Sequence, residues 1–178
     1  CLDVPSSGNY FLNGHDVSKL TDNQLSDIRN KEIGFIFQGF NLIANLDAVE
    51  HVELPLIYRG LGKQKRRRIA VEALKKVGLG TRMKQKPNQH TGGKQQRVAV
   101  ARGIAAQPPN VLADEPTGNL DTKSTKDIME ILKGLHKGGR TVIIITHDDE
   151  IAQQVNRVVR IIGGRIENDY LNEEREGA

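Results

Sequence analysis

Cysteine is almost absent from this 178-residue sequence, and long hydrophobic runs are absent altogether. The single cysteine, Cys1, cannot form a disulfide within the chain, which excludes the disulfide-rich secreted scaffolds and favours a reducing compartment. The longest aliphatic run, residues 142–145, is far shorter than the roughly 20 residues that a membrane-spanning helix needs. No signal peptide opens the chain, so we expect any membrane association to go through a partner.

Charge and hydrophobic content are those of an ordinary globular domain. The 26 basic and 22 acidic residues leave a net charge of +4, which favours an anionic partner only slightly. The 37% of hydrophobic residues suffice for one domain with a sizeable core. Because the sequence starts at Cys1 rather than at a methionine, next to a Pro-Ser-Ser-Gly turn, we expect it to be a piece of a longer protein.

Alternating strand and helix patterns predict the fold class. A short strand at 10–12 meets an Asn13-Gly14 turn, a helix starts near Thr21, and a buried strand covers 34–37. Further helices are expected through 49–56, 69–77, 92–106 and 121–138, and further strands at 111–113, 141–146, 158–162 and around 166. This alternation predicts an α/β core of mainly parallel sheet, 1–44 and 107–178, with a helical subdomain inserted over 45–106.

A basic run, 63–68, precedes the second helix pattern of that subdomain. The simplest interpretation is the solvated face of a helix. An acidic partner surface is the alternative, and nucleic acid is a third possibility that only this run and the pI near 9.2 support.

Two adjacent carboxylates, Asp114 and Glu115, follow the hydrophobic strand at 111–113. Side chains alternate along a strand, so we expect the two carboxylates to diverge and to serve different tasks, one on a metal ion and the other on a water molecule. Strand ends in parallel α/β sheets are where ligands bind. A structural or accidental pair is the alternative, but the next strand ends in His147, which favours a shared phosphate-facing edge.

Two weaker signals accompany the carboxylates. Gln38 ends the strand at 34–37, and its amide can bind a metal or orient water. Gly92 and Gly93 open a helix, where free backbone N–H groups and the positive helix end favour a phosphate. Alone, each feature is as readily a structural polar group or a plain turn, so the prediction depends on their combination.

Taken together and in order, these motifs resemble the ABC ATPases, and the match covers essentially the whole chain. The motifs that carry the resemblance are Gly34-Phe35-Ile36-Phe37-Gln38, His90-Thr91-Gly92-Gly93-Lys94-Gln95-Gln96-Arg97, Asp114-Glu115-Pro116-Thr117-Gly118-Asn119-Leu120-Asp121 and Thr146-His147-Asp148. Segments 41–43, 53–60 and 113–121 look most like the branch that serves macrolide exporters and lipoprotein-release complexes. The resemblance implies a P-loop NTPase fold.

By that resemblance, four residues serve ATP hydrolysis with Mg²⁺. Gln38 is implied near both the metal and the transmembrane partner, and Asp114 would hold Mg²⁺ through water. Glu115 would be the general base for the attacking water, and His147 would stabilise charge on the γ-phosphate. ATP and Mg²⁺ are therefore the implied cofactors.

The resemblance also implies a site shared between two subunits. The signature residues that would close over the second subunit's ATP are Thr91, Gly92, Gly93 and Lys94, and Asp121 would lie at the dimer contact. The usual family signature is Leu-Ser-Gly-Gly-Gln. His90 therefore replaces a leucine that packs inward, and Lys94 replaces a neutral amide.

The largest departure from the family is an absence. No Gly-x-x-x-x-Gly-Lys-Ser/Thr phosphate-binding loop (P-loop) occurs in the 178 residues, so we expect a chain truncated before or at the P-loop and lacking the first strands of the core. Asn110 also stands where the family strand has an aliphatic residue. If it is buried without a partner, its amide costs about 1–3 kcal/mol.

The function that follows is an ATP-hydrolysing ABC transporter subunit, dimeric on ATP binding. It would power export or lipoprotein-release-type transport through a transmembrane permease, at the cytoplasmic face of the cell membrane. The isolated chain is expected to be inactive. Two alternatives stay open: a non-catalytic subunit that only completes a partner's ATP site, and a soluble ABC ATPase acting on nucleic acid, although no nucleic acid partner is expected.

Overall fold

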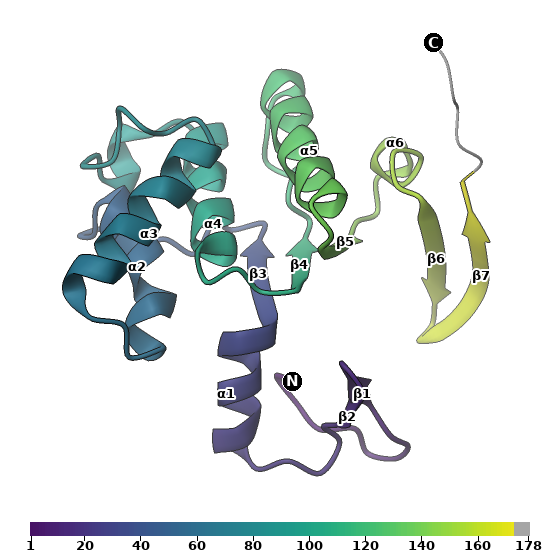
Figure 1. Cartoon of the computed structure of the whole chain (residues 1–178). Coiled ribbons are helices and arrows are strands. Elements are labelled where there is room, and N and C mark those ends of the chain that lie inside the picture. Colours follow the sequence, from purple (N-terminus) through teal and green to yellow (C-terminus); the bar gives the residue numbers. More distant parts are fainter. Residues whose placement is uncertain (173–178) are drawn as a thin grey trace. The chain divides into compact units, whose positions relative to one another are not determined.

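The computed structural model describes residues 1–172, and its first elements are a small hairpin and a helix (Figure 1). Strands β1 (Phe11–Leu12) and β2 (His15–Asp16) pair antiparallel. The two residues between them, Asn13 and Gly14, have φ angles of 50° and 80°, as a tight hairpin turn requires. Helix α1 (Asp22–Glu32) begins with a capping box between Thr21 and Gln24, which confirms the predicted helix start.

A three-stranded sheet forms the base of the predicted catalytic edge. Its order is β3 (Ile33–Phe37), β4 (Asn110–Asp114) and β5 (Thr141–Ile145). Strands β3 and β4 run parallel with Phe37 opposite Asp114, so they end side by side. The predicted α/β class with parallel strands is confirmed, and each predicted strand except the one expected around residue 166 lies within two residues of its expected bounds.

Helices fill the chain between β3 and β4, as predicted. They are α2 (Ala48–Tyr58), α3 (Lys63–Lys76), the 3₁₀ turn η1 (Pro87–Gln89) and α4 (Gly92–Ala105). Helix α3 begins with the basic run, earlier than its apolar pattern indicated. Helix α5 (Thr122–Lys137) follows β4. The chain divides into two compact units, Cys1–Ile144 and the segment from Ile145 onward, so the predicted boundaries of the helical subdomain stay a prediction.

Helix α4 packs against α2, α3, α5 and strand β3 (Figure 1). A tight contact between α4 and the sheet is made at two glycines. A Cβ atom on Gly34 of β3 would collide with the Gly103 carbonyl oxygen and would lie 2.9 Å from Cγ of Pro108. Because the nearest neighbour is backbone, only a residue without a side chain allows this contact.

We expect Gly34→Ala to destabilise the chain by about 1–3 kcal/mol or more, since a methyl group there forces α4 away from β3. Gly134→Ala is the matched control, because Gly134 lies in α5 and an added Cβ meets nothing within 4 Å. That change should stabilise the chain by about 0.5–1 kcal/mol. Urea unfolding followed by circular dichroism measures both, and equal effects at the two glycines would contradict the close approach.

Arg59 joins the ends of two other helices. Its guanidinium donates to the carbonyl oxygens of Asn30 and Lys31 at the end of α1, at 2.6 and 2.9 Å, and to that of Ala106 after α4, at 2.8 Å. These carbonyls are among the last ones of their helices, which lack partners within the helix. A cation at two helix C-termini also interacts favourably with both helix dipoles.

The fully buried His51 of α2 fixes the chain before that helix. The Ile43 amide donates to its Nε2 at 2.7 Å, and its Nδ1 lies 2.8 Å from the Asp47 carbonyl oxygen. Because Nε2 accepts, Nδ1 carries the proton, and the neutral ring satisfies both bonds. Burial lowers the pKa of His51, and the nearby Arg102 charge lowers it further.

The free energy of unfolding should fall as the pH falls below about 6.5, the ordinary histidine pKa. Above that pH, the titration of His51 should not change the free energy of unfolding. The sign follows because the unfolded chain binds the proton more readily than the folded one. Buried His90, whose pKa burial also lowers, acts in the same direction. Urea unfolding at pH 5.0, 6.0 and 7.5 should show a smaller pH dependence in His51→Leu. The exposed His136→Leu is the control, and an equal reduction there would contradict the assignment.

The unit from Ile145 onward contains the short helix α6 (Asp149–Ala152) and the antiparallel strands β6 (Arg157–Ile162) and β7 (Arg165–Leu171). The Gly163-Gly164 turn between the strands is confirmed, with φ angles of 56° and 76°. Strand β7 is longer than predicted, and neither α6 nor η1 was predicted. Among the described residues, no helix is long and apolar enough to span a bilayer.

Candidate functional site

Gln38 and Glu115 come at the same point of the sheet, one residue past the ends of β3 and β4. The register pairs Phe37 with Asp114, so each residue directly follows a paired one. Asp114 is the last residue of β4. Asp114 and Gln38 are exposed, and Glu115 is half-buried. These three residues therefore lie at neighbouring strand ends, and their roles stay a prediction.

The side chains of Asp114 and Glu115 were expected to point in different directions because side chains alternate along a strand. That explanation is wrong. Strand β4 ends at Asp114, and Glu115 has a φ of 43°, in the left-handed region that residues with a side chain rarely occupy. The direction of its carboxylate is therefore set by a turn, in which the Gly118 amide donates to the Glu115 carbonyl oxygen at 3.2 Å. Such backbone conformations cost about 1–3 kcal/mol and persist where neighbours hold them.

The side chain of Gln38 lies against the backbone of Gly118. A Cβ atom at Gly118 would be 2.7 Å from the Gln38 Nε2 atom and 3.4 Å from its Cδ atom. This contact brings the amide of the β3 loop to the loop that carries Glu115. The β3 loop itself is fixed by Arg102 of α4, whose guanidinium donates to the carbonyl oxygens of Asn41 at 2.6 Å and Phe40 at 3.1 Å.

The signature segment forms the start of α4, as the sequence indicated. Thr91 is the N-cap residue, exposed, and its side chain makes no capping hydrogen bond to the helix. Gly93 is buried and packs closely against α5. A Cβ atom at Gly93 would lie 2.8 Å from Cβ of Ser124 in that helix. Gly92 is half-buried and would meet its neighbours at an ordinary 3.7 Å. Lys94, also half-buried, follows in the first turn.

His90 is buried immediately before the signature, with 8% of its surface exposed. The inward packing expected of a leucine here is therefore kept by an imidazole. Burial lowers the pKa of His90, and the Gln85 backbone partly offsets that effect. Gln95 of α4 fixes the segment by donating to the carbonyl oxygens of Pro87 and His90, at 3.0 and 3.2 Å.

Asp121 is the N-cap of α5. Its carboxylate accepts the Ser124 amide at 2.9 Å and the Ser124 hydroxyl at 2.7 Å, and these bonds lower its pKa. The structure thus gives this residue a helix-capping role. The dimer contact implied by the family resemblance stays a prediction.

His147 lies in the second unit, and its approach to Glu115 stays a prediction. Within that unit, Asp148 caps the start of α6 by accepting the Glu150 amide at 2.8 Å. The Asp148 amide donates to the Thr146 hydroxyl at 3.1 Å. The second bond joins the two residues on either side of His147, and the first fixes the start of α6 after it.

Asn110 does not carry the cost that an unpartnered buried amide would. It is half-buried, and its Nδ2 atom donates to the Glu32 carbonyl oxygen at the end of α1, at 3.2 Å. The polar residue at the start of β4 therefore fixes the end of a helix instead of weakening the strand.

The residues present fit a hydrated Mg²⁺ ion better than a site made by protein ligands alone. Among the described residues, no three His, Cys, Asp or Glu side chains form a metal-binding cluster. Mg²⁺ usually keeps several waters and takes one or two carboxylates together with substrate phosphates. Asp114 with the Gln38 amide matches that donor set.

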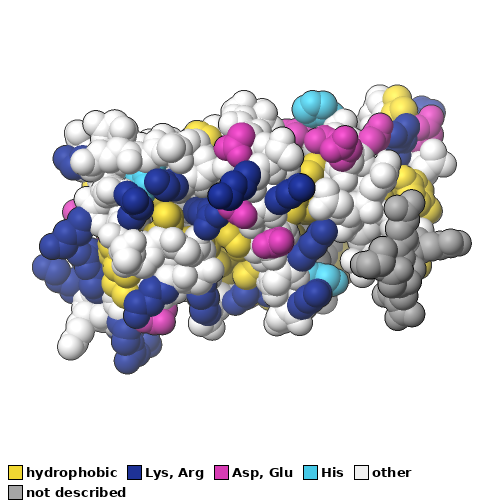
Figure 2. All heavy atoms as spheres, turned by 90° about the horizontal axis from the view of Figure 1, so that it is seen from above, with side chains coloured by type: hydrophobic (Ala, Val, Ile, Leu, Met, Phe, Trp, Pro, Cys, Tyr) yellow, Lys and Arg dark blue, Asp and Glu magenta, His cyan; other side chains and the backbone are white. Residues whose placement is uncertain are grey.

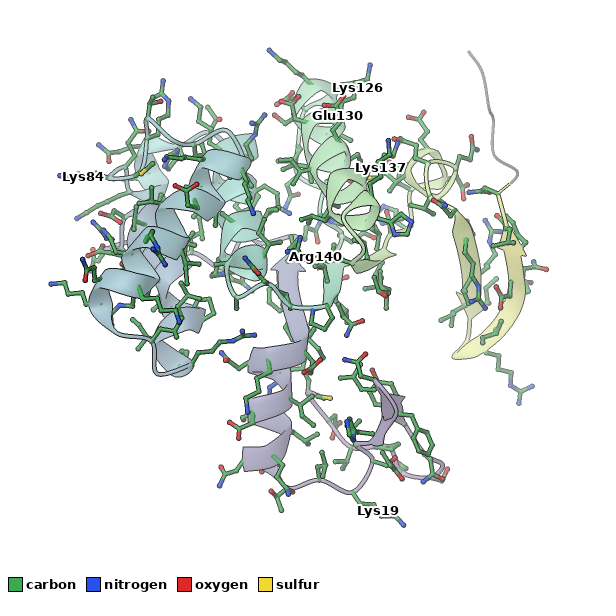
Figure 3. All side chains as sticks on the ribbon, viewed as in Figure 1. Lys19, Lys84, Lys126, Glu130, Lys137 and Arg140 are labelled. Carbon is green, nitrogen blue, oxygen red and sulfur yellow. The ribbon has the colours of Figure 1, made fainter. Side chains whose placement is uncertain are left out.

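The basic run is not simply a solvated face. Arg66 and Arg67 lie 3.9 and 3.7 Å from the buried carboxylate of Glu53 on α2. Arg68 and Arg140 line a hollow of about 320 Å³ between α3 and the ends of α4 and α5. Figure 3 labels Arg140, after the end of α5. No candidate site residue lines that hollow. Figure 2 shows Lys and Arg side chains gathered at the left of the view, the side on which Figure 1 draws α2 and α3.

A parallel strand pair with a Gln and an Asp-Glu pair at its end, beside a helix opened by two glycines, defines an ABC-type ATPase cassette. The chain belongs to the ABC transporter family, whose model matches residues 2–118. It is 48% identical over 167 residues to an ABC transporter ATP-binding protein of Thermotoga maritima, covering 94% of this chain and 71% of that protein. The ATP-binding protein YknY of Bacillus subtilis is also 48% identical, with 93% and 72% covered.

Longer relatives and solved structures match as well. The macrolide export ATP-binding/permease protein MacB of Hyphomonas neptunium is 46% identical, but this chain spans only 27% of its length while 98% of this chain is covered. The cassette MJ0796, solved as a dimer in a post-hydrolysis state bound to ADP and Pi, has a TM-score of 0.87 and 41% identity, with 98% of this chain and 77% of that chain covered. The fold is therefore that of an ABC ATPase cassette.

Three residues that hold the loops of the candidate site in place were not predicted from the sequence. Arg102 and Gln96 lie on α4 and bond the two loops that carry Gln38 and Glu115. His51 fixes the chain between Ile43 and Asp47. Gln96 lies on the buried face of α4, but a glutamine at such a position is not distinguished by helical periodicity, which marks apolar residues. The helical pattern therefore did not indicate that Gln96 is buried.

Proposed function

We propose that the chain carries the hydrolytic residues of an ATP-driven transport subunit. Glu115 activates the attacking water, and Asp114 and Gln38 hold Mg²⁺, which when bound offsets charge on the phosphates. The observation that carries the proposal is the contact between the Gln38 amide and Gly118, which brings two strand-end loops together. His147 completes the site by donating to the γ-phosphate.

The proposed partner in hydrolysis is a second cassette. Thr91, Gly92, Gly93 and Lys94 meet the γ-phosphate of ATP bound by that cassette, and Asp121 lies at the contact between the two. An exposed Thr91 whose side chain does not cap its own helix supports this role, because its hydroxyl remains available for a phosphate. The dimeric, ADP-bound form in which MJ0796 was solved supports it as well.

The proposed machine is an exporter or lipoprotein-release complex. The chain would act on a transmembrane permease, bound at the cytoplasmic face of the cell membrane. The MacB relatives, named for macrolide export, support export as the direction of transport. The alternative is a subunit that only completes a partner's ATP site, which the cation Lys94 in the signature favours.

A fusion protein tests the proposal. The P-loop segment of an ABC relative is joined in front of residues 1–178 (the P-loop fusion protein), and phosphate release from ATP is measured with Mg²⁺ and with EDTA. We expect Mg²⁺-dependent release, with a rate that rises more than linearly with protein concentration because two cassettes form the site. ATP binding without any phosphate release would instead support the non-catalytic alternative.

A further inference from the structure

The signature helix is bonded to the loop behind the proposed catalytic base. Gln96, fully buried in α4, donates from Nε2 to the carbonyl oxygen of Pro116 at 2.7 Å. Pro116 is itself buried and directly follows Glu115. A carbonyl oxygen can only accept, so the amide nitrogen of Gln96 must face it. The amide oxygen of Gln96, Oε1, is buried without a hydrogen-bond partner among the described residues.

The backbone at Glu115 needs such support. Its φ of 43° is unfavourable for a residue with a side chain, and the proline that follows makes departures from extended backbone harder still. Two further bonds shape the loop locally, from the Gly118 amide to Glu115 at 3.2 Å and from the Leu120 amide to Thr117 at 3.1 Å. Gln96 supplies the bond that joins this loop to another element at Pro116.

We infer that Gln96 is a positioning residue for hydrolysis. Through Pro116 it holds Glu115 in its left-handed conformation and links the carboxylate to the start of α4, three residues after Gly93. The bond is buried, and buried hydrogen bonds are costly to lose because their groups cannot turn to water instead. The inference rests on the hydrolytic role proposed for Glu115.

Two substitutions separate the hydrogen bond from the packing. Gln96→Met keeps nearly the same volume and removes the donor. Gln96→Glu keeps the shape and turns an acceptor toward the Pro116 carbonyl oxygen. The matched control is Gln64→Glu, the same change at an exposed position of α3. Circular dichroism establishes that each variant is folded.

The first measurement is amide hydrogen exchange in the whole 178-residue chain. By NMR hydrogen exchange, the Gly118 and Leu120 amides should lose protection in both Gln96 variants and keep it in Gln64→Glu. If one Gln96 variant fails to fold, the other decides. Folded variants in which both amides keep their protection would overturn the inference.

The second readout is the P-loop fusion protein. Gln96→Met should lower kcat on the order of 10²-fold, as small misplacements of catalytic groups do, with KM for ATP nearly unchanged. A raised KM with unchanged kcat would assign Gln96 to nucleotide binding and overturn the inference. If the parent fusion protein binds ATP without hydrolysing it, the proposed function fails, while the amide protection still decides whether Gln96 holds the loop.

Discussion

Glu115→Gln in the P-loop fusion protein should lower ATP turnover by a factor on the order of 10²–10⁴ while leaving ATP affinity nearly unchanged. The amide keeps the shape of the side chain, but it cannot accept the proton of the attacking water. The half-buried position of Glu115, one residue past the end of β4, places the change at the proposed reacting edge and away from the core. Phosphate release and nucleotide titration measure the two quantities separately.

Glu130→Gln is the matched control for that experiment. Glu130 is an exposed residue of α5 (Figure 3), and the same loss of one negative charge there should leave turnover within about twofold. If Glu115→Gln leaves turnover unchanged, Glu115 is not the base. If it lowers affinity as much as turnover, the residue serves nucleotide binding instead.

The 178-residue chain by itself should bind ATP at least about 10⁴-fold more weakly than the P-loop fusion protein. A P-loop offers several charge-assisted hydrogen bonds, each contributing about 1.5–3 kcal/mol, so four of them amount to about 6–12 kcal/mol before non-additivity. At about 1.4 kcal/mol per tenfold, that range corresponds to four decades or more. Isothermal titration of both proteins measures the difference.

Lys94 is the group that would have to bind the phosphates if the 178-residue chain binds ATP tightly. It is a half-buried cation in the first turn of α4, beside the free amides of the helix start. A micromolar dissociation constant for the folded 178-residue chain would show that such a group binds the phosphates without a P-loop. Lys94→Gln, which restores the neutral amide usual in the family signature, would then abolish that binding.

The sequence predicted the parts of the site that depend on local pattern. Strand ends at Phe37 and Asp114 follow from hydrophobic runs, and the start of α4 follows from Gly92 and Gly93. It also predicted the class of fold, because strands that alternate with helices favour parallel pairing. The register of β3 on β4, which brings Gln38 level with Glu115, could only be expected in outline.

What could not be predicted depends on contacts between distant residues. The left-handed backbone of Glu115 and the partners of Arg102 and Gln96 are set by α4 packing over two loops that lie up to 62 residues away in the chain. Asn110 is a second example. From the sequence, a polar residue in this strand is expected to destabilise it, and only the structure shows its hydrogen bond to the end of α1. Helical and strand periodicity give the face of an element but not its partner.

The contact between β3 and α4 determines how mutations at the two positions combine. Gly34 and Gly103 meet through backbone atoms, so neither position has a side chain that could be shortened to make room for the other. A change at one therefore has no compensating change at its partner, and a double alanine variant should be less stable than the native chain and no more stable than Gly34→Ala alone. In a library that randomises both codons together, selection for folded protein should return glycine at each position independently.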